Sequence, residues 1–204
     1  MDAETGFGES VIGRVECGTS PVARLASGTV SVLSREELRA AIAAQPPLVE
    51  GIDPQTQLQP NGIDLRVDRI QRLTSPGLLG AAPNLREPAA REDVQPDADG
   101  WWDLHQGSYV IGYAEKVNLP PDLMAFARPR STLLRSGVAL QSAVWDAGYS
   151  GRGEGLLSVL NQRGYRLQRG AAVLQLVFLR LSVPTAEGYK GKYQGEGQGP
   201  AGTR

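Results

Sequence analysis

The chain of 204 residues contains few of the side chains that enzymes most often use as nucleophiles and metal ligands. It has one cysteine, Cys17, and one histidine, His105. A single cysteine excludes a disulfide within the chain, and with so few thiols and imidazoles a zinc site is not expected. A Ser-His-Asp or Cys-His mechanism would depend on His105 alone, so these mechanisms are not favoured.

A strong net charge and a long apolar run are also missing. The formal net charge is −1, and only three of the 21 basic residues are lysines. A nearly neutral chain offers no general basic field for nucleic acid. No stretch approaches the ~20 apolar residues of a membrane span, and the N-terminus lacks the order of a signal peptide. We therefore expect neither a nucleic-acid nor a membrane partner, and a reducing cytoplasm fits the single cysteine.

The length fits one domain with tails. Residues 1–30 are rich in glycine, serine, threonine and acids, which predicts a disordered N-terminal extension. A domain over residues 31–184 follows, interrupted by a proline-rich surface excursion over residues 75–100. Residues 185–204 form a glycine-rich arm. Its composition fits either a flexible tail or a segment that closes over a ligand, with a tyrosine on a base and a lysine on phosphate.

Hydrophobic periodicity predicts many short strands and one early helix. Ser34 and Glu37 form a capping box before a helix over Arg35–Ala44, which Pro46 and Pro47 end. A glycine-rich hairpin is expected at Gly151–Gly155, between two of the strands. The expected strands lie within Gln59–Ile70, Tyr109–Val117, Met124–Ala127, Val138–Trp145, Leu156–Leu160, Tyr165–Leu167 and Ala171–Leu181, the last of them central in a sheet. This spacing predicts an all-β barrel or sandwich.

The stretch Arg128–Asn161 carries most of the candidate chemistry. Arg130 and Ser131 offer hydrogen-bond donors to a phosphate, or lie in a solvated turn. Asp146 ends an apolar run, where it either caps a turn or acts as a general base for water. Tyr149 either packs as an ordinary strand residue or lies beneath a sugar, where its ring leaves no space for a 2′-hydroxyl.

Two further polar residues lie in apolar strands. Asp64 alternates with apolar neighbours and is either an exposed strand acid or an anchor for Mg²⁺ or its waters. Gln175 interrupts a long apolar run, so its amide needs partners. It is either a satisfied core amide or a ligand contact.

The ordered motifs GIDL, PRSTLLRSG, VWDAGYSG, RGAAVLQLVF and KYQGEGQG resemble those of the dUTPase/dCTP deaminase superfamily, from about Val32 to Gly199. The resemblance implies a homotrimer of distorted, jelly-roll-like β-barrels, with three sites at subunit interfaces. It implies a pyrimidine deoxynucleoside triphosphate as substrate, with Mg²⁺. Asp146 would activate water, and Asp64 would lie near the metal, in contact with it through water. The implied phosphate contacts are Arg130, Ser131, Arg135, Gln175 and Lys192, and the implied nucleoside contacts are Gln141, Tyr149, Tyr193 and Gln194.

The branch of the superfamily depends on a carboxylate at the pyrimidine ring. Similar deaminases carry a glutamate ten residues after the aspartate and three before an asparagine, and these positions here are Leu156 and Ser158. The nearest acid, Glu154, is predicted in the glycine-rich hairpin. The chain therefore resembles an archaeal-type dUTPase, a dUTP diphosphatase that would keep uracil out of DNA and supply dUMP for thymidylate synthesis. The alternatives are a dCTP deaminase, with Glu154 moved to the ring, and a non-catalytic nucleotide-binding trimer.

Overall fold

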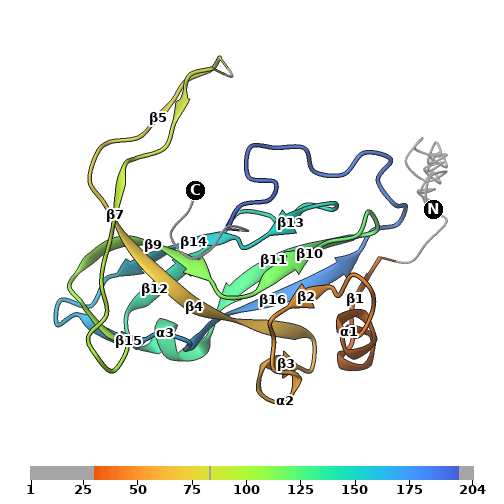
Figure 1. Cartoon of the computed structure of the whole chain (residues 1–204), viewed down its shortest axis with the longest axis horizontal. Coiled ribbons are helices and arrows are strands. Elements are labelled where there is room, and N and C mark those ends of the chain that lie inside the picture. Colours follow the sequence, from red (N-terminus) through yellow and green to blue (C-terminus); the bar gives the residue numbers. More distant parts are fainter. Residues whose placement is uncertain (1–29, 83, 198–204) are drawn as a thin grey trace, which may run out of the picture.

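A computed structural model describes residues 30–82 and 84–197 (Figure 1). Apart from Val30, the predicted N-terminal extension lies outside these residues. Helix α1 (Arg35–Ile42) has the predicted capping box, in which the Glu37 N–H donates to Ser34 Oγ and the Ser34 N–H donates to Glu37 Oε2. Two short helices, α2 (Pro54–Gln57) and α3 (Ser131–Arg135), were not predicted. In the described ranges no helix is long and apolar enough to cross a membrane.

One antiparallel sheet forms most of the molecule and confirms the all-β prediction. Along its path lie β1 (Ser31–Val32), β16 (Ala172–Arg180), β4 (Gly62–Leu73), β9 (Gly107–Tyr113), β14 (Glu154–Val159) and β12 (Val138–Gln141). Strand β11 (Leu123–Pro129) pairs with β16, and β3 (Leu58–Gln59) and β7 (Arg91–Asp93) pair with β4. The sheet curls into half of a barrel, in which β16 has partners along both edges, as predicted (Figure 1).

Three smaller sheets complete the fold. Strand β10 (Lys116–Asn118) pairs with β13 (Ser150–Gly151) and β2 (Val49–Glu50), and β15 (Tyr165–Gln168) pairs with β8 (Trp101–Leu104). Within residues 75–100, β5 (Leu78–Leu79) and β6 (Arg86–Glu87) form a hairpin that projects from the body (Figure 1). The chain then returns through β7, which pairs with β4.

The core is formed by the apolar side chains that alternate along the strands and point to the inner face of the sheet. On β4, Ile63, Leu65 and Val67 have no exposed side-chain surface, and Leu176 and Phe178 of β16 are equally buried. Burying each such side chain stabilises the fold by about 1.5–3 kcal/mol. The alternation is therefore the main reason that these segments become strands.

The strands predicted on either side of Gly151–Gly155 do pair, since β12 and β14 are antiparallel neighbours, but the turn between them does not lie at these glycines. Gly151 belongs to β13 and pairs with β10, whereas β14 begins at Glu154 and pairs with β9 and β12. Residues 142–153, which include the two-residue strand β13, form a long connecting loop between β12 and β14, so β12 also ends at Gln141 rather than at Trp145. The glycines serve close packing instead: a Cβ at Gly153 would lie 2.3 Å from the ring of Trp145.

Candidate active site

A pocket of about 390 Å³ lies beside the loop 142–153, a volume suited to a small ligand. Its chemistry is mixed, with aromatic rings, carboxylates and guanidinium groups. The polar and aromatic residues that line it are Arg86, Arg91, Trp145, Asp146, Tyr149, Glu154, Tyr189, Tyr193 and Glu196. Three of the predicted site residues, Asp146, Tyr149 and Tyr193, thus share one pocket.

The aromatic wall of the pocket is a chain of edge-on contacts. Tyr149 packs against Trp145 at a centroid distance of 5.5 Å and against Tyr189 at 5.7 Å. Tyr149 is only 7% exposed, and its burial raises the pKa of its hydroxyl well above the usual value. The ring is therefore a neutral, fixed surface against which a sugar or a base can pack.

Asp146 lies at the rim of this pocket with an exposed side chain. Trp145, immediately before it, is fixed to the body by two main-chain hydrogen bonds with Ala125, of 2.9 and 3.1 Å. The turn closes through the Asp146 main-chain carbonyl, which accepts from the Tyr149 N–H at 3.1 Å. Within the described part of the chain, the Asp146 carboxylate accepts no hydrogen bond. It therefore does not cap the turn and is free to bind a water.

The C-terminal arm, as far as residue 197, docks on the loop of its own chain. The Tyr189 N–H donates to the Ala147 carbonyl at 2.8 Å, and the Gly195 N–H donates to the Ser150 carbonyl at 2.8 Å. Gln194 accepts from the Ser150 N–H at 3.1 Å and donates to the Gly148 carbonyl at 3.0 Å. In this arrangement Gln194 fastens the arm to the loop.

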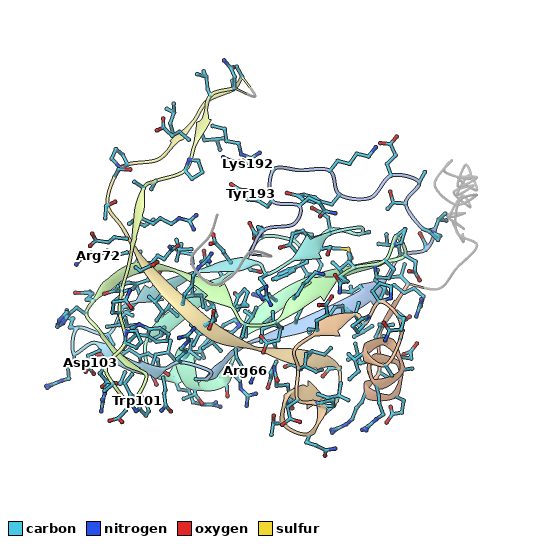
Figure 2. All side chains as sticks on the ribbon, in the orientation of Figure 1. Arg66, Arg72, Trp101, Asp103, Lys192 and Tyr193 are labelled. Atoms are coloured by element: carbon cyan, nitrogen blue, oxygen red, sulfur yellow. The ribbon has the colours of Figure 1, made fainter. Side chains whose placement is uncertain are left out.

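Of the other arm residues, Tyr193 lines the pocket and Lys192 is exposed. The guanidinium of Arg86, from β6, lies 5.6 Å from the centroid of the Tyr193 ring, so the projecting hairpin contacts the arm. Figure 2 shows Lys192 and Tyr193 at the end of the arm nearer to this hairpin. The Tyr149 hydroxyl donates to Glu196 Oε1 at 3.4 Å. Burial, and then the charge of Glu154, raise the pKa of Glu196 to about 7, so both of its forms exist at neutral pH.

A second group of predicted residues gathers on β4, β16 and β11. Asp64 lies opposite Gln175, which in turn lies opposite Arg128. Asp64 is 1% exposed, which excludes the alternative of an exposed strand acid. Its carboxylate forms an ion pair with Arg130 and accepts from Gln59 Nε2 at 2.8 Å. Asp64 therefore orients the guanidinium of Arg130, which is 42% exposed and can bind an anion.

Gly62, on β4, packs closely against β16 beside this second group. A Cβ at Gly62 would lie 2.7 Å from the Leu176 carbonyl and 2.8 Å from Gln175 Nε2. A side chain there would displace the Gln175 amide. Ser131 opens α3 directly after Arg130, and Arg135 ends it; both side chains are exposed.

A buried carboxylate that the sequence did not indicate supports the strand of Asp64. Glu115 is fully buried and accepts from the Arg66 Nε at 2.6 Å and from the Arg66 N–H at 2.9 Å. Gln57 donates both to Glu115 and to the Asp64 carbonyl, each at 2.8 Å. A charge so buried is tolerated only with such partners, and here they fix the main chain of β4 at Asp64.

The second group does not form a magnesium site by itself. Among the described residues no three His, Cys, Asp or Glu side chains lie close enough together to hold a metal ion. Asp64 is buried, and its Oδ2 is engaged by Arg130 and Gln59. Mg²⁺ prefers one or two free carboxylates together with phosphates and waters, so the residues present do not fit a metal that the protein alone would hold.

The second group of residues lies outside the pocket of the first. Asp64, Arg130, Ser131 and Gln175 do not line the pocket of Asp146 and Tyr149. Of the remaining predicted contacts, Gln141 is exposed at the end of β12 and does not line the pocket either. One chain therefore offers a pocket with a free carboxylate and, separately, a set of anion-binding donors.

The sequence placed Glu154 in a hairpin, and the structure corrects this. Glu154 is the first residue of β14, and its side chain lines the pocket. Arg86, Arg91 and Glu196, which line it as well, were not predicted. In the sequence, Glu154 and Glu196 each stand between two glycines, whereas Arg86 and Arg91 lie in the proline-rich stretch and carry no such signal.

Comparison with known proteins identifies the family. The dCTP deaminase-like family matches residues 32–181. A protein of Methanococcoides burtonii named probable deoxyuridine 5′-triphosphate nucleotidohydrolase is 44% identical over 168 residues, which cover 82% of this chain and 99% of that protein. A protein of the same name from Archaeoglobus fulgidus is 42% identical over 167 residues, 82% of this chain and 98% of that protein.

Among solved structures, the 2′-deoxycytidine 5′-triphosphate deaminase of Agrobacterium tumefaciens has a similar fold. The TM-score is 0.56 at 22% identity, over 74% of this chain and 48% of that one. This likeness concerns the fold alone. On the family match and the archaeal relatives, the chain belongs to the dCTP deaminase-like family.

Proposed function

We propose that the protein is a dUTP diphosphatase, which hydrolyses dUTP to dUMP and pyrophosphate. The observation that supports this most directly is the free Asp146 carboxylate at the rim of an aromatic pocket of nucleoside size. The archaeal relatives bear the name of this activity. Such an enzyme, which we place in the cytoplasm, removes a uracil precursor from the DNA precursor pool and supplies dUMP.

The proposed assembly is a homotrimer with its sites between subunits. The pocket supplies the base site and the water-activating acid, and a neighbouring subunit supplies the donors around Arg130. The donors around Arg130 do not line the pocket of Asp146, which supports a site that a neighbouring subunit completes.

In the proposed reaction, Asp146 orients a water and accepts its proton as the water oxygen attacks the α-phosphorus in line. The bond between the α-phosphorus and the bridging oxygen breaks, and pyrophosphate leaves. The donors of Arg130, Ser131, Gln175, Arg135 and Lys192 hold phosphate oxygens and balance the developing charge. Bound to the triphosphate, Mg²⁺ would supply further charge neutralisation and arrive as part of the substrate.

The nucleoside part rests on the pocket wall. Tyr149 would lie beneath the deoxyribose and leave no space for a 2′-hydroxyl. Tyr193 and Gln194 would act from the arm, and Gln141 from the end of β12. Closing the arm over the nucleotide would exclude bulk water from the phosphates.

The reaction products distinguish a dUTP diphosphatase from a dCTP deaminase and from a non-catalytic binding protein. The protein, with Mg²⁺, is incubated with dUTP and separately with dCTP, and pyrophosphate and ammonia are measured. Pyrophosphate from dUTP without ammonia from dCTP is the expected result. Ammonia from dCTP would favour a deaminase, for which the position of Glu154 in the pocket is the supporting observation. Neither product would favour a non-catalytic binding protein.

Removing the arm after Tyr189 is expected to lower kcat/KM for dUTP at least about tenfold, because the water-excluding cover is lost. The truncated chain keeps Tyr189, which packs on the core, so its melting temperature should change little. Pyrophosphate release and thermal unfolding measure the two effects. Full activity of the truncated chain would show that the arm is only a tail.

A further inference from the structure

Glu154 is a pocket carboxylate to which the proposed reaction gives no task. Its Oε1 accepts from Arg69 and its Oε2 from Arg91, each at 2.5 Å. Arg69 lies on β4 and Arg91 on β7, so both oxygens are held from different strands. The Glu154 side chain is 21% exposed and faces the pocket with Trp145 and Tyr149.

The strand register of the sheet brings Arg69 and Glu154 to the same level on either side of β9. Gly112 on β9 lies opposite both Arg69 on β4 and Glu154 on β14, so the three form a row across adjacent strands. A Cβ at Gly112 would lie 2.9 Å from Arg69 Nε and 3.0 Å from its Cγ. The Arg69 side chain therefore crosses β9 over the place where a side chain would stand.

This fixes both the position and the hydrogen-bonding character of Glu154. Both carboxylate oxygens accept from guanidinium groups, and a carboxylate held in this way presents acceptors and no donor to the pocket. Asp146 lies on a loop and Glu196 on the arm, whereas Glu154 is held by the sheet itself. Groups on strands keep their geometry better than groups on loops, as a site that must distinguish two similar ligands requires.

Uracil and cytosine differ in the feature that such an acceptor detects. Uracil carries a hydrogen on N3, and cytosine carries a lone pair there. A fixed carboxylate that faces N3 accepts a hydrogen bond from the N3–H of uracil. It repels cytosine, because the carboxylate oxygen and N3 of cytosine are both acceptors. With cytosine bound, the carboxylate would be left without a hydrogen-bond donor in a closed site. The free-energy cost of this unpaired group discriminates strongly against cytosine.

We propose that Glu154 selects the base, accepting the N3–H of uracil and rejecting the N3 lone pair of cytosine, with Arg69 and Arg91 as its positioning residues. The inference rests on the proposed function and assigns its specificity. Because both carboxylate oxygens are held, the same arrangement keeps Glu154 from carrying protons to the ring.

The first test is Glu154→Gln, with kcat/KM measured for hydrolysis of dUTP and of dCTP. The neutral amide of Gln can donate as well as accept, so the ratio of dUTP to dCTP should fall by about tenfold or more. An unchanged ratio would overturn the proposal, even if both rates fell. Ammonia release from dCTP by the wild-type protein that vanishes in Glu154→Gln would also overturn it.

A second variant substitutes none of the residues that line the pocket. Gly112→Ala pushes aside Arg69, a flexible side chain, so the fold should survive while Glu154 loses one of its two holders. The dUTP-to-dCTP ratio should fall at least about threefold, less than for Glu154→Gln because Arg91 remains. The control is Glu92→Gln, which removes an exposed ion pair with Arg72 between the same two strands, β4 and β7, and should leave the ratio unchanged. A ratio that falls in this control as far as in Gly112→Ala would overturn the proposal.

Glu196→Gln distinguishes the two carboxylates of the pocket. It should alter kcat/KM for both nucleotides in parallel, and a loss of selectivity equal to that of Glu154→Gln would overturn the assignment. Calorimetric binding of the non-hydrolysable α,β-imido analogues of dUTP and dCTP separates the two proposals. Selective binding that Glu154→Gln abolishes, in a protein that releases no pyrophosphate, would support this inference while the proposed reaction fails. Pyrophosphate release with unselective binding would overturn the inference alone.

Discussion

Asp146→Asn is expected to lower kcat for dUTP hydrolysis by at least about 100-fold, the lower range for loss of a general base. Asn has nearly the same shape as Asp but cannot take the proton of the attacking water. The side chain is exposed and accepts no hydrogen bond in the described part of the chain, so the change should not affect the fold. Pyrophosphate release gives kcat, and thermal unfolding checks stability.

Measuring the affinity of this variant for a nucleotide analogue shows whether the loss lies in the chemical step or in nucleotide binding. The affinity for the α,β-imido analogue of dUTP should stay within about threefold of the wild-type value, because Asp146 acts on the water and not on the ground-state nucleotide. Asp103→Asn is the matched control, since Asp103 is an exposed acid that pairs with Arg166 away from the pocket. Near-normal turnover of Asp146→Asn would remove Asp146 from the proposed role.

The fold was predictable where periodicity and burial agree. The alternation in Gln59–Ile70 and the apolar run in Ala171–Leu181 both became long strands, because their apolar side chains fill the core. The helices α2 and α3 are too short for a 3.6-residue period to show. The pairing of the strands around Gly151–Gly155 was predicted correctly, but the turn was misplaced, because glycines such as Gly153 are needed for tertiary contacts that local turn chemistry does not reveal.

The candidate site was predictable only in part, for a similar reason. Motif order singled out Asp146, Tyr149 and Tyr193, which line one pocket. The pairing of Asp64 with Arg130 and the clamp on Glu154 depend on strand register. Arg69 and Glu154 are 85 positions apart in the sequence, and no local pattern joins them. Register across a curled sheet is a property of the whole core, so these contacts required the structure.

A mixture of two inactive variants, Asp146→Asn and Arg130→Gln, is expected to recover about a quarter of wild-type activity if the sites lie between subunits of a trimer. Arg130→Gln removes the guanidinium that would bind phosphate, yet keeps an amide that can donate to the buried Asp64. Alone it should lose at least about 100-fold in kcat, as when a donor to developing charge is removed. Each variant thus lacks one of the two groups of the site.

The recovery follows from the geometry of the two groups. Asp146 lines the pocket and Arg130 does not, so in the proposed trimer a complete site would draw each from a different chain. In randomly mixed trimers, half of the pockets carry an intact Asp146, and half of those meet a neighbour with an intact Arg130, which leaves about a quarter of the sites intact. Purifying doubly tagged trimers removes those made of one variant only, and about one site in three is then intact. The two variants are co-refolded with different tags, doubly tagged oligomers are purified, and pyrophosphate release is compared with that of either variant alone; light scattering gives the subunit number. Doubly tagged trimers without recovered activity would mean that one chain supplies both groups.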